Sequence, residues 1–219
     1  MKRLCAFTLL LASWGAVAGE FVDLRRATAI RGDAVAGAAK VAVCVACHGP
    51  DGNAVVPAFP ALAGQHAGYL YQSLDGFRRR ADPASPMTPQ VQHLSDADLR
   101  DIAAYFASRS RTPASGAASG DSAGARLFRE GDPSRGIAPC QGCHGPAAQG
   151  HPLRAEMAHY DYYPALAAQQ PDYLVARLRQ YRDGGPGDTS NALLMRGVAR
   201  HLDDAAIAEL AAWLAATPR

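Results

Sequence analysis

The sequence predicts an all-α protein built from two tandem domains, and three observations support this. The chain has 219 residues, which suits two domains of roughly a hundred residues each. Its second half repeats the order of motifs found in the first half. Neither half shows sustained alternation of period two, whereas the last segment of each half carries an apolar stripe at helical spacing.

The internal repeat gives the expected domain boundaries. Each half opens a helical segment with Gly-Asp, has a Cys-rich motif followed by Gly-Pro, and then carries Pro-Ala-Leu-Ala, Tyr-Leu, a methionine and a closing helix. We expect domain one over residues 19–111 and domain two over residues 122–219. The stretch 112–121 between them is rich in Pro, Gly and Ser and is predicted to be a linker. In the two halves, Gly32-Asp33 matches Gly120-Asp121, the Pro-Ala-Leu-Ala motif begins at Pro60 and at Pro164, and the Tyr-Leu motif begins at Tyr69 and at Tyr173.

The closing helices can be predicted in detail. In the first half, Ser95 to Asp98 forms a capping-box-like start. In the second half, Asp203 is the expected N-cap, and Ala206 stands where the box would have an acid. Each start is followed by apolar residues at i, i+3, i+4 and i+7, namely Leu99, Ile102, Ala103 and Phe106, and then Ile207, Leu210, Ala211 and Leu214. We interpret Tyr105 and Trp213 as packing residues on these helices.

Two C-x-x-C-H motifs carry the chemistry. They consist of Cys44, Cys47 and His48 in the first half and Cys140, Cys143 and His144 in the second. This pentapeptide is the attachment site of a c-type haem. The two thiols form thioether bonds with the two vinyl groups of one porphyrin, and the next histidine supplies a nitrogen to the iron. The sequence therefore predicts two covalently bound haem c groups on one chain.

Other chemistry for the same residues fits less well. Structural zinc needs four ligands, whereas each motif offers three donors and the two motifs are almost a hundred residues apart. A redox C-x-x-C would be expected in a βαβ context, which the sequence lacks. Simple disulfides would leave both histidines without a role.

A haem that only transfers electrons needs a second axial ligand. Met87 and Met195 occupy equivalent places in the repeat, and each lies seven residues before a leucine, Leu94 or Leu202. We predict these two methionines as the ligands opposite His48 and His144. Met157 has no counterpart in the first half and is interpreted as a core filler.

A ligating histidine usually donates its other ring nitrogen to a fixed acceptor. We expect the carbonyl of Pro50 to serve His48 and that of Pro146 to serve His144. The remaining histidines are expected at the surface or in loops: His66, His93, His151, His159 and His201. His159 is an exception to this expectation, because it lies among tyrosines beside Met157 in the sequence.

The N-terminus has the features of a secretory signal peptide. Lys2 and Arg3 precede an apolar run that ends in Ala16-Val17-Ala18, an A-x-A cleavage site. The run is too short for a membrane anchor. We expect residues 1–18, with Cys5, to be cleaved and the mature protein to reside in the periplasm. The whole chain has 22 Lys and Arg and 20 Asp and Glu, so losing two cations leaves it formally neutral, which gives no reason to expect nucleic acid as a partner.

These motifs together resemble the cytochrome c4 family of dihaem c-type cytochromes. The resemblance rests on five stretches: 32–53, 60–65, 94–105, 128–140 and 144–146. It implies two cytochrome c-like domains, each wrapped around one covalent haem and packed with pseudo-twofold symmetry. It also implies an electron-transfer protein, not an enzyme, that carries electrons from a cytochrome bc1-type donor of the respiratory chain towards a terminal oxidase. Peripheral membrane association would then come through such partners.

Two features of the second half leave the role open. The second half carries extra residues, above all a Tyr-rich insertion over Gly150–Tyr163, and has Ala168 where the first half has Gly64. The alternative role is the dihaem subunit of a dehydrogenase complex, of the flavocytochrome sulfide dehydrogenase or quinoprotein alcohol dehydrogenase kind, with the insertion as docking surface. A dihaem peroxidase would need an open iron site, and the paired methionines disfavour that.

Overall fold

The computed structural model describes residues 21–114, 116 and 120–218, and this part of the chain is helical with only two isolated β-bridges. The proposed signal peptide and part of the linker lie outside the described residues. The first half contains η1 (Leu24–Arg26), α1 (Ala34–Ala38), α2 (Val45–His48), α3 (Ala67–Arg80), α4 (Thr88–Val91) and α5 (Asp96–Ala107). The second contains α6 (Ala123–Glu130), η2 (Pro133–Arg135), α7 (Gln141–His144), η3 (Pro152–Arg154), η4 (Ala158–Tyr162), α8 (Pro171–Arg182), α9 (Ser190–Ala199) and α10 (Asp204–Ala216).

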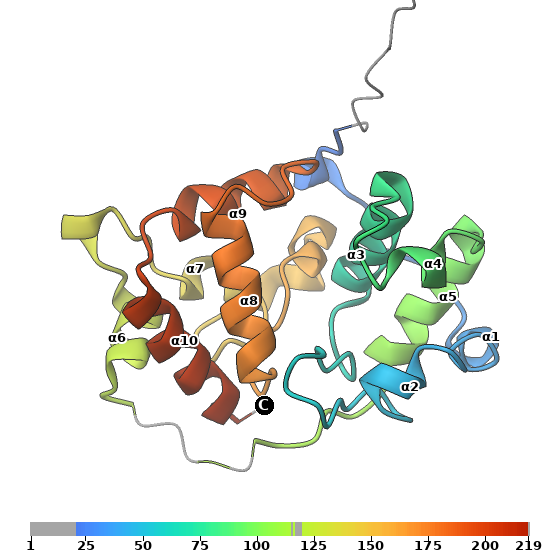
Figure 1. The fold of residues 1–219 in the computed structure, drawn as a ribbon, viewed down its shortest axis with the longest axis horizontal. Coiled ribbons are helices and arrows are strands. Elements are labelled where there is room, and N and C mark those ends of the chain that lie inside the picture. The colour runs from blue at the N-terminus through green and yellow to red at the C-terminus, as the bar shows by residue number, and fades with distance from the viewer. Residues whose placement is uncertain (1–20, 115, 117–119, 219) are drawn as a thin grey trace, which may run out of the picture.

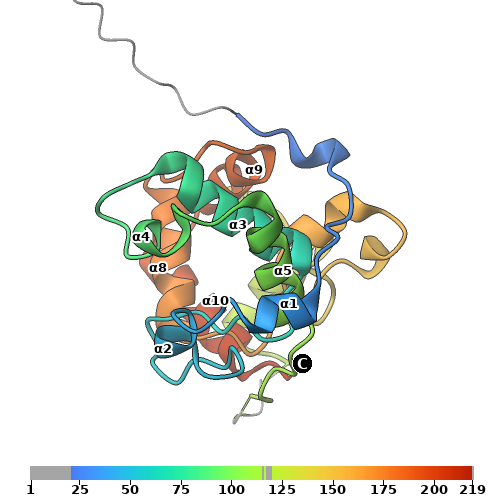
Figure 2. The ribbon, with the colours of Figure 1, turned by 90° about the vertical axis from the view of Figure 1, so that its right-hand side faces the viewer.

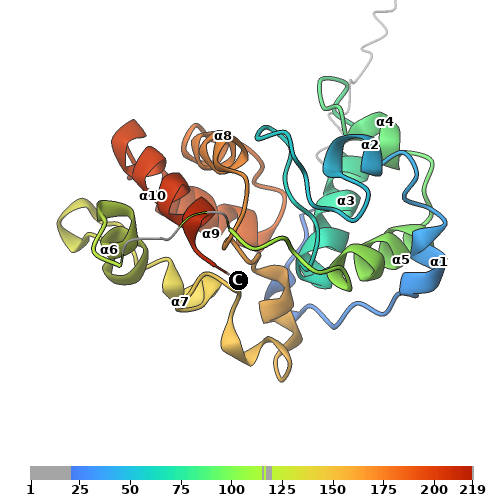
Figure 3. The same cartoon turned by 90° about the horizontal axis from the view of Figure 1, so that it is seen from below.

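The two halves fold as two lobes with the same order of α-helices. Figures 1 and 3 show them side by side, and Figure 2 looks onto the first lobe with the second behind it. In each lobe the closing helix packs against the opening helix and the long middle helix, α5 on α1 and α3, and α10 on α6 and α8. The repeat in the sequence is therefore a repeat of tertiary structure.

The opening and closing helices of each lobe cross closely at a glycine. A Cβ on Gly37 of α1 would lie 2.1 Å from the Asp101 carbonyl oxygen of α5, and a Cβ on Gly124 of α6 would lie 2.1 Å from the Glu209 carbonyl oxygen of α10. Backbones approach this closely only where one partner has no side chain. The opening and closing helices of each lobe therefore cross in backbone contact.

The predicted closing helices are confirmed. Ser95 and Asp98 form a complete capping box at the start of α5, and the Asp203 side chain accepts a hydrogen bond from the Ala206 amide at the start of α10. All eight residues of the two apolar stripes are buried. Trp213 is also buried and packs on Phe128 with 4.9 Å between ring centroids. The opening helix α6 follows Gly120-Asp121 and has Ser122 as its N-cap.

The Tyr-rich insertion packs against the first lobe. It contains η3 and η4, and the Asp161 carboxylate in η4 accepts a 2.6 Å hydrogen bond from the Gly68 amide of α3. His151 stacks on Tyr160 with 3.6 Å between ring centroids. Part of the insertion thus belongs to the boundary between the lobes.

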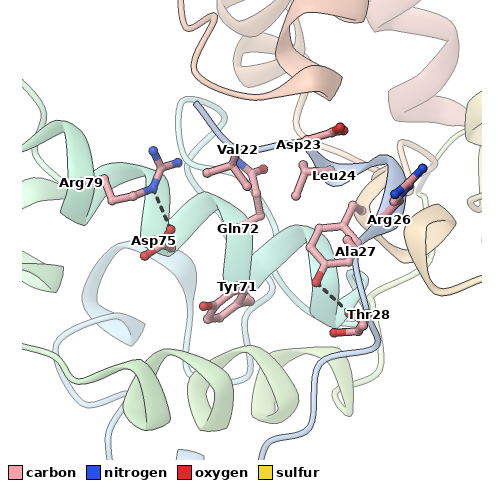
Figure 4. A pocket seen from close by; sticks show the side chains of 11 residues that line it. Val22, Asp23, Leu24, Arg26, Ala27, Thr28, Tyr71, Gln72, Asp75 and Arg79 are labelled. Carbon is pink, nitrogen blue, oxygen red and sulfur yellow. Dashed lines mark hydrogen bonds and ion pairs between the residues drawn. The ribbon is translucent and has the colours of Figure 1, made fainter. Parts of the chain in front are cut away.

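The segment that precedes α1 crosses from the first lobe to the second. The Val22 amide donates to the Asp188 carbonyl, the Ser190 amide donates to the Val22 carbonyl, and the Leu24 amide donates to the Ser190 hydroxyl. Figure 1 shows this blue segment at the end of α9. Figure 4 shows Leu24 facing a pocket that the segment forms with α3. We call residues 21–28 the N-terminal strap.

Candidate functional site

The two C-x-x-C-H motifs form matching single helical turns. In α2 the His48 amide donates to the Cys44 carbonyl over 3.0 Å, and in α7 the His144 amide donates to the Cys140 carbonyl over 3.0 Å. Each turn ends at a glycine with positive φ, 82° for Gly49 and 79° for Gly145. One turn of helix thus carries both thiols and the histidine of each motif.

Both motif histidines are buried and held by a backbone carbonyl. His48 Nδ1 lies 2.9 Å from the Pro60 oxygen, and His144 Nδ1 lies 2.8 Å from the Pro164 oxygen. A carbonyl only accepts hydrogen bonds, so each Nδ1 carries the proton and each Nε2 keeps its lone pair. Burial lowers the pKa of both imidazoles, which favours the neutral form that binds metal.

The predicted acceptors, Pro50 and Pro146, are wrong. The correct prolines lie farther along the chain, in a loop that returns to the motif. In the first lobe this loop is held where the Leu62 and Ala63 amides donate to the Gly52 carbonyl. In the second lobe the equivalent amides donate to the Ala148 carbonyl. The motif spacing contains no information about this loop closure.

Burial favours the neutral form of three of the four motif thiols. Burial raises the pKa of Cys140 to about 11 and raises the pKa of Cys44 and Cys143 as well. Among the described residues no cluster of three or more His, Cys, Asp or Glu side chains is arranged to hold a metal ion. The zinc interpretation therefore gains no support, whereas thioether formation consumes the thiols.

The two predicted methionine ligands lie at related but different positions. Met87 is half-buried and immediately precedes α4, whereas Met195 is half-buried within α9, whose first turn precedes it. The helix at this place in the repeat therefore extends farther on the N-terminal side of the methionine in the second lobe than in the first. Met157 is 43% exposed, so its interpretation as core filler is wrong.

One of the remaining histidines is buried between the lobes. His66 is only 3% exposed, and its Nδ1 lies 2.7 Å from the Tyr163 carbonyl of the other lobe. His66 lies in the loop just before α3, as expected, but it is buried and not at the surface, because it contacts a residue about a hundred positions away in sequence. No local pattern signals it.

Two buried polar atoms fit the carboxylates of a haem. Among the described residues, Thr88 Oγ1 and Arg177 Nε are buried without a hydrogen-bond partner. Thr88 follows Met87 directly. The Arg177 guanidinium contacts the Tyr181 hydroxyl at 3.0 Å and forms no ion pair with any described carboxylate. A hydroxyl and a guanidinium are donors that haem propionates would satisfy, so the donor set of this chain fits a covalently bound haem in each lobe.

Two helical lobes of the same fold, each with a haem-attachment turn and a buried neutral histidine, define a dihaem c-type cytochrome. The family model of cytochrome c matches residues 31–110 and 122–218. Cytochrome c4 of Thiocapsa roseopersicina is 40% identical, over 84% of this chain and 92% of its own length. The reduced recombinant cytochrome c4 structure from Pseudomonas stutzeri superposes with a TM-score of 0.74 and 38% identity, covering 85% of this chain and all of that one. This chain belongs to the cytochrome c4 family.

A relative with a different name is also similar. The thiosulfate dehydrogenase electron acceptor of Stutzerimonas stutzeri is 35% identical, over 78% of this chain and 77% of its own length. Membership of the cytochrome c4 family makes this protein an electron carrier with two haem c groups and not an enzyme. Within the described residues no helix is long and apolar enough to span a membrane.

Proposed function

We propose that this protein is a periplasmic shuttle that carries one electron per haem from a respiratory-chain donor to a terminal oxidase or another acceptor. The observation that supports it most is the pair of buried, neutral histidines, each fixed through Nδ1 on a proline carbonyl next to a haem-attachment turn. The same arrangement in both lobes provides two sites of equal chemistry.

Bound haem supplies a one-electron change at its iron. The chain's own residues hold the ligands in place during that change. The Pro60 and Pro164 carbonyls hold the rings of His48 and His144 in one orientation, with Nε2 available. We propose that Met87 and Met195 would hold the iron of the haem in each lobe together with these histidines. A thioether favours ferrous over ferric iron and leaves no open position for oxygen or peroxide. Such sites exchange electrons without binding a substrate.

A second role is supported by one observation, the similarity to a thiosulfate dehydrogenase electron acceptor. In this role a dehydrogenase, rather than a respiratory complex, reduces the haems. Both roles use the same sites, so they differ in the donor alone.

Electron-transfer kinetics with purified donors test the proposal. The oxidised holoprotein, purified from the periplasmic fraction, is mixed in a stopped-flow instrument with a reduced cytochrome bc1 complex or with thiosulfate dehydrogenase and its substrate. We expect fast reduction of both haems by the bc1 complex and reoxidation by a terminal oxidase. Fast reduction by the dehydrogenase alone would favour the second role. A pyridine haemochrome count other than two per chain would contradict both.

A further inference from the structure

Two equivalent glutamines cross between the lobes. Gln65 and Gln169 occupy the same place in the repeat, and each makes two hydrogen bonds to one alanine of the opposite lobe. Gln65 Nε2 donates to the Ala165 carbonyl over 2.8 Å, and the Ala165 amide donates to Gln65 Oε1 over 2.9 Å. Gln169 Nε2 donates to the Ala61 carbonyl over 3.0 Å, and the Ala61 amide donates to Gln169 Oε1 over 2.7 Å.

These contacts are buried and rigid. Both glutamine side chains belong to nearly fully buried residues. Each Oε1 also accepts the amide of the following residue, His66 at 2.8 Å or Gln170 at 2.9 Å. The amide groups are therefore fixed in orientation, and losing one would leave buried backbone groups without partners, which is costly.

Each contacted alanine shares a peptide group with the proline that holds the axial histidine. The Pro60 carbonyl and the Ala61 amide belong to one peptide bond, which accepts from His48 Nδ1 on one side and donates to Gln169 on the other. The peptide bond of Pro164 and Ala165 joins His144 to Gln65 in the same way. A hydrogen-bond chain thus runs from each histidine into the opposite lobe.

We infer that Gln65 and Gln169 are crossed positioning residues, each of which adjusts the reduction potential of the haem in the lobe opposite its own. Hydrogen bonds in a chain polarise one another. Donation from the Ala61 amide to Gln169 makes the Pro60 carbonyl a stronger acceptor for His48. The imidazole then has more anionic character and stabilises ferric iron, and this lowers the potential. The inference rests on the proposed axial role of His48 and His144.

Single replacements in the holoprotein test the crossed pattern. Gln169→Met conserves volume but removes both bonds to Ala61, and Gln65→Met does the same for Ala165. Gln170→Met is the matched control, because Gln170 also donates across the lobes, to the Ala54 carbonyl, but touches neither proline peptide. The two potentials are followed by spectroelectrochemistry, with the haem methyl NMR signals assigned to each lobe.

We expect Gln169→Met to raise the potential of the haem at His48 and Gln65→Met to raise that of the haem at His144, each with a smaller change at the other haem. Gln169→Glu keeps an acceptor for the Ala61 amide and should not raise the potential. If a Met variant does not fold, two measurements still test whether Gln169 acts on the haem at His48. One is the potential of Gln169→Glu, and the other is the Nδ1–H resonance of His48 in the wild-type protein and in Gln170→Met. That resonance should lie in the strongly hydrogen-bonded range.

Three results would overturn the inference: a larger shift at the haem of the mutated residue's own lobe than at the opposite haem, equal shifts at both haems, or a Gln170→Met effect as large as the others. Failure of the proposed methionine ligation can be distinguished from failure of this inference, because the wild-type spectrum would then lack the long-wavelength methionine-to-iron band. If the glutamine variants leave both potentials unchanged while that band is present, the role of the two glutamines is contradicted and the proposed function is not.

Discussion

Individual residues in the two lobes keep the same backbone even where their side chains differ. Ala168 replaces Gly64, yet both residues have left-handed φ values, 54° and 60°. The Ala168 amide donates to the Leu214 carbonyl of α10, and the Gly64 amide donates to the Phe106 carbonyl of α5. These two carbonyls occupy equivalent positions on the two closing helices. A non-glycine residue in this region carries strain of about 1 kcal/mol. The contacts around Gln169 therefore hold a conformation that alanine alone disfavours.

Replacing the proposed methionine ligands tests the site at single residues. Met87→Ala and Met195→Ala should each remove about half of the long-wavelength methionine-to-iron band, open one iron to added ligands and lower its potential. Optical titration with imidazole measures this. Met157→Leu is the control and should change nothing, because Met157 is exposed. Loss of half of the band in Met157→Leu, with the band intact in Met195→Ala, would reverse the assignment.

Among the helices, the contact of α1 with α5 is reinforced by charge. Lys40, just after α1, contacts the Asp98 carboxylate at 2.6 Å and the Asp101 carboxylate at 2.7 Å. Asp101 also accepts the Asp33 amide at the start of α1. The hydrogen bond from Lys40 is the main reason that the pKa of each carboxyl lies below its usual value of 3.8.

The depressed pKa values predict an acid-dependent stability. The carboxylates are ionised in the fold, so their contribution is present above pH ~4 and is lost as the pH falls through the lower folded-state pKa values. Lys40→Met should therefore be less stable than wild type near neutral pH, and the difference should narrow between pH ~4 and ~2. Denaturant midpoints measured against pH check this. Lys40→Arg should keep the wild-type profile, and a pH-independent difference would contradict the interpretation.

For the whole molecule, the N-terminal strap connects the first lobe to the helix that carries Met195. Leu24 is 5% exposed, and its amide donates to Ser190 at the first residue of α9. Asp188, just before α9, receives ion pairs from Arg79 and Arg80 of the first lobe. The lobes are thus joined beside α9 as well as through the crossed glutamines.

Leu24→Ala should loosen this junction. Removing a buried leucine side chain costs about 2–5 kcal/mol, and we expect about 2 kcal/mol here because the strap lies at the surface. Hydrogen exchange followed by mass spectrometry should show faster exchange in α9 and unchanged exchange in α5. If hydrogen exchange became faster by the same factor in α9 and α5, Leu24 would stabilise the whole protein and not this junction in particular.

Features that depend on local spacing can be predicted from the order of the residues alone. The C-x-x-C-H turns, the closing helices with their caps and stripes, and the tandem repeat all follow from residues within a few positions of one another or from self-similarity. The class of protein follows from these features, because haem attachment needs only one helical turn.

Contacts between groups far apart in the chain depend on how the folded lobes pack together. The Pro60 and Pro164 carbonyls replaced the expected Pro50 and Pro146 because the returning loop brings them to the histidines. His66 became buried and Gln65 crossed to Ala165 because the second lobe packs on the first. Such contacts depend on how two folded lobes fit together, and polar side chains facing that contact have the same local sequence signature as those facing water.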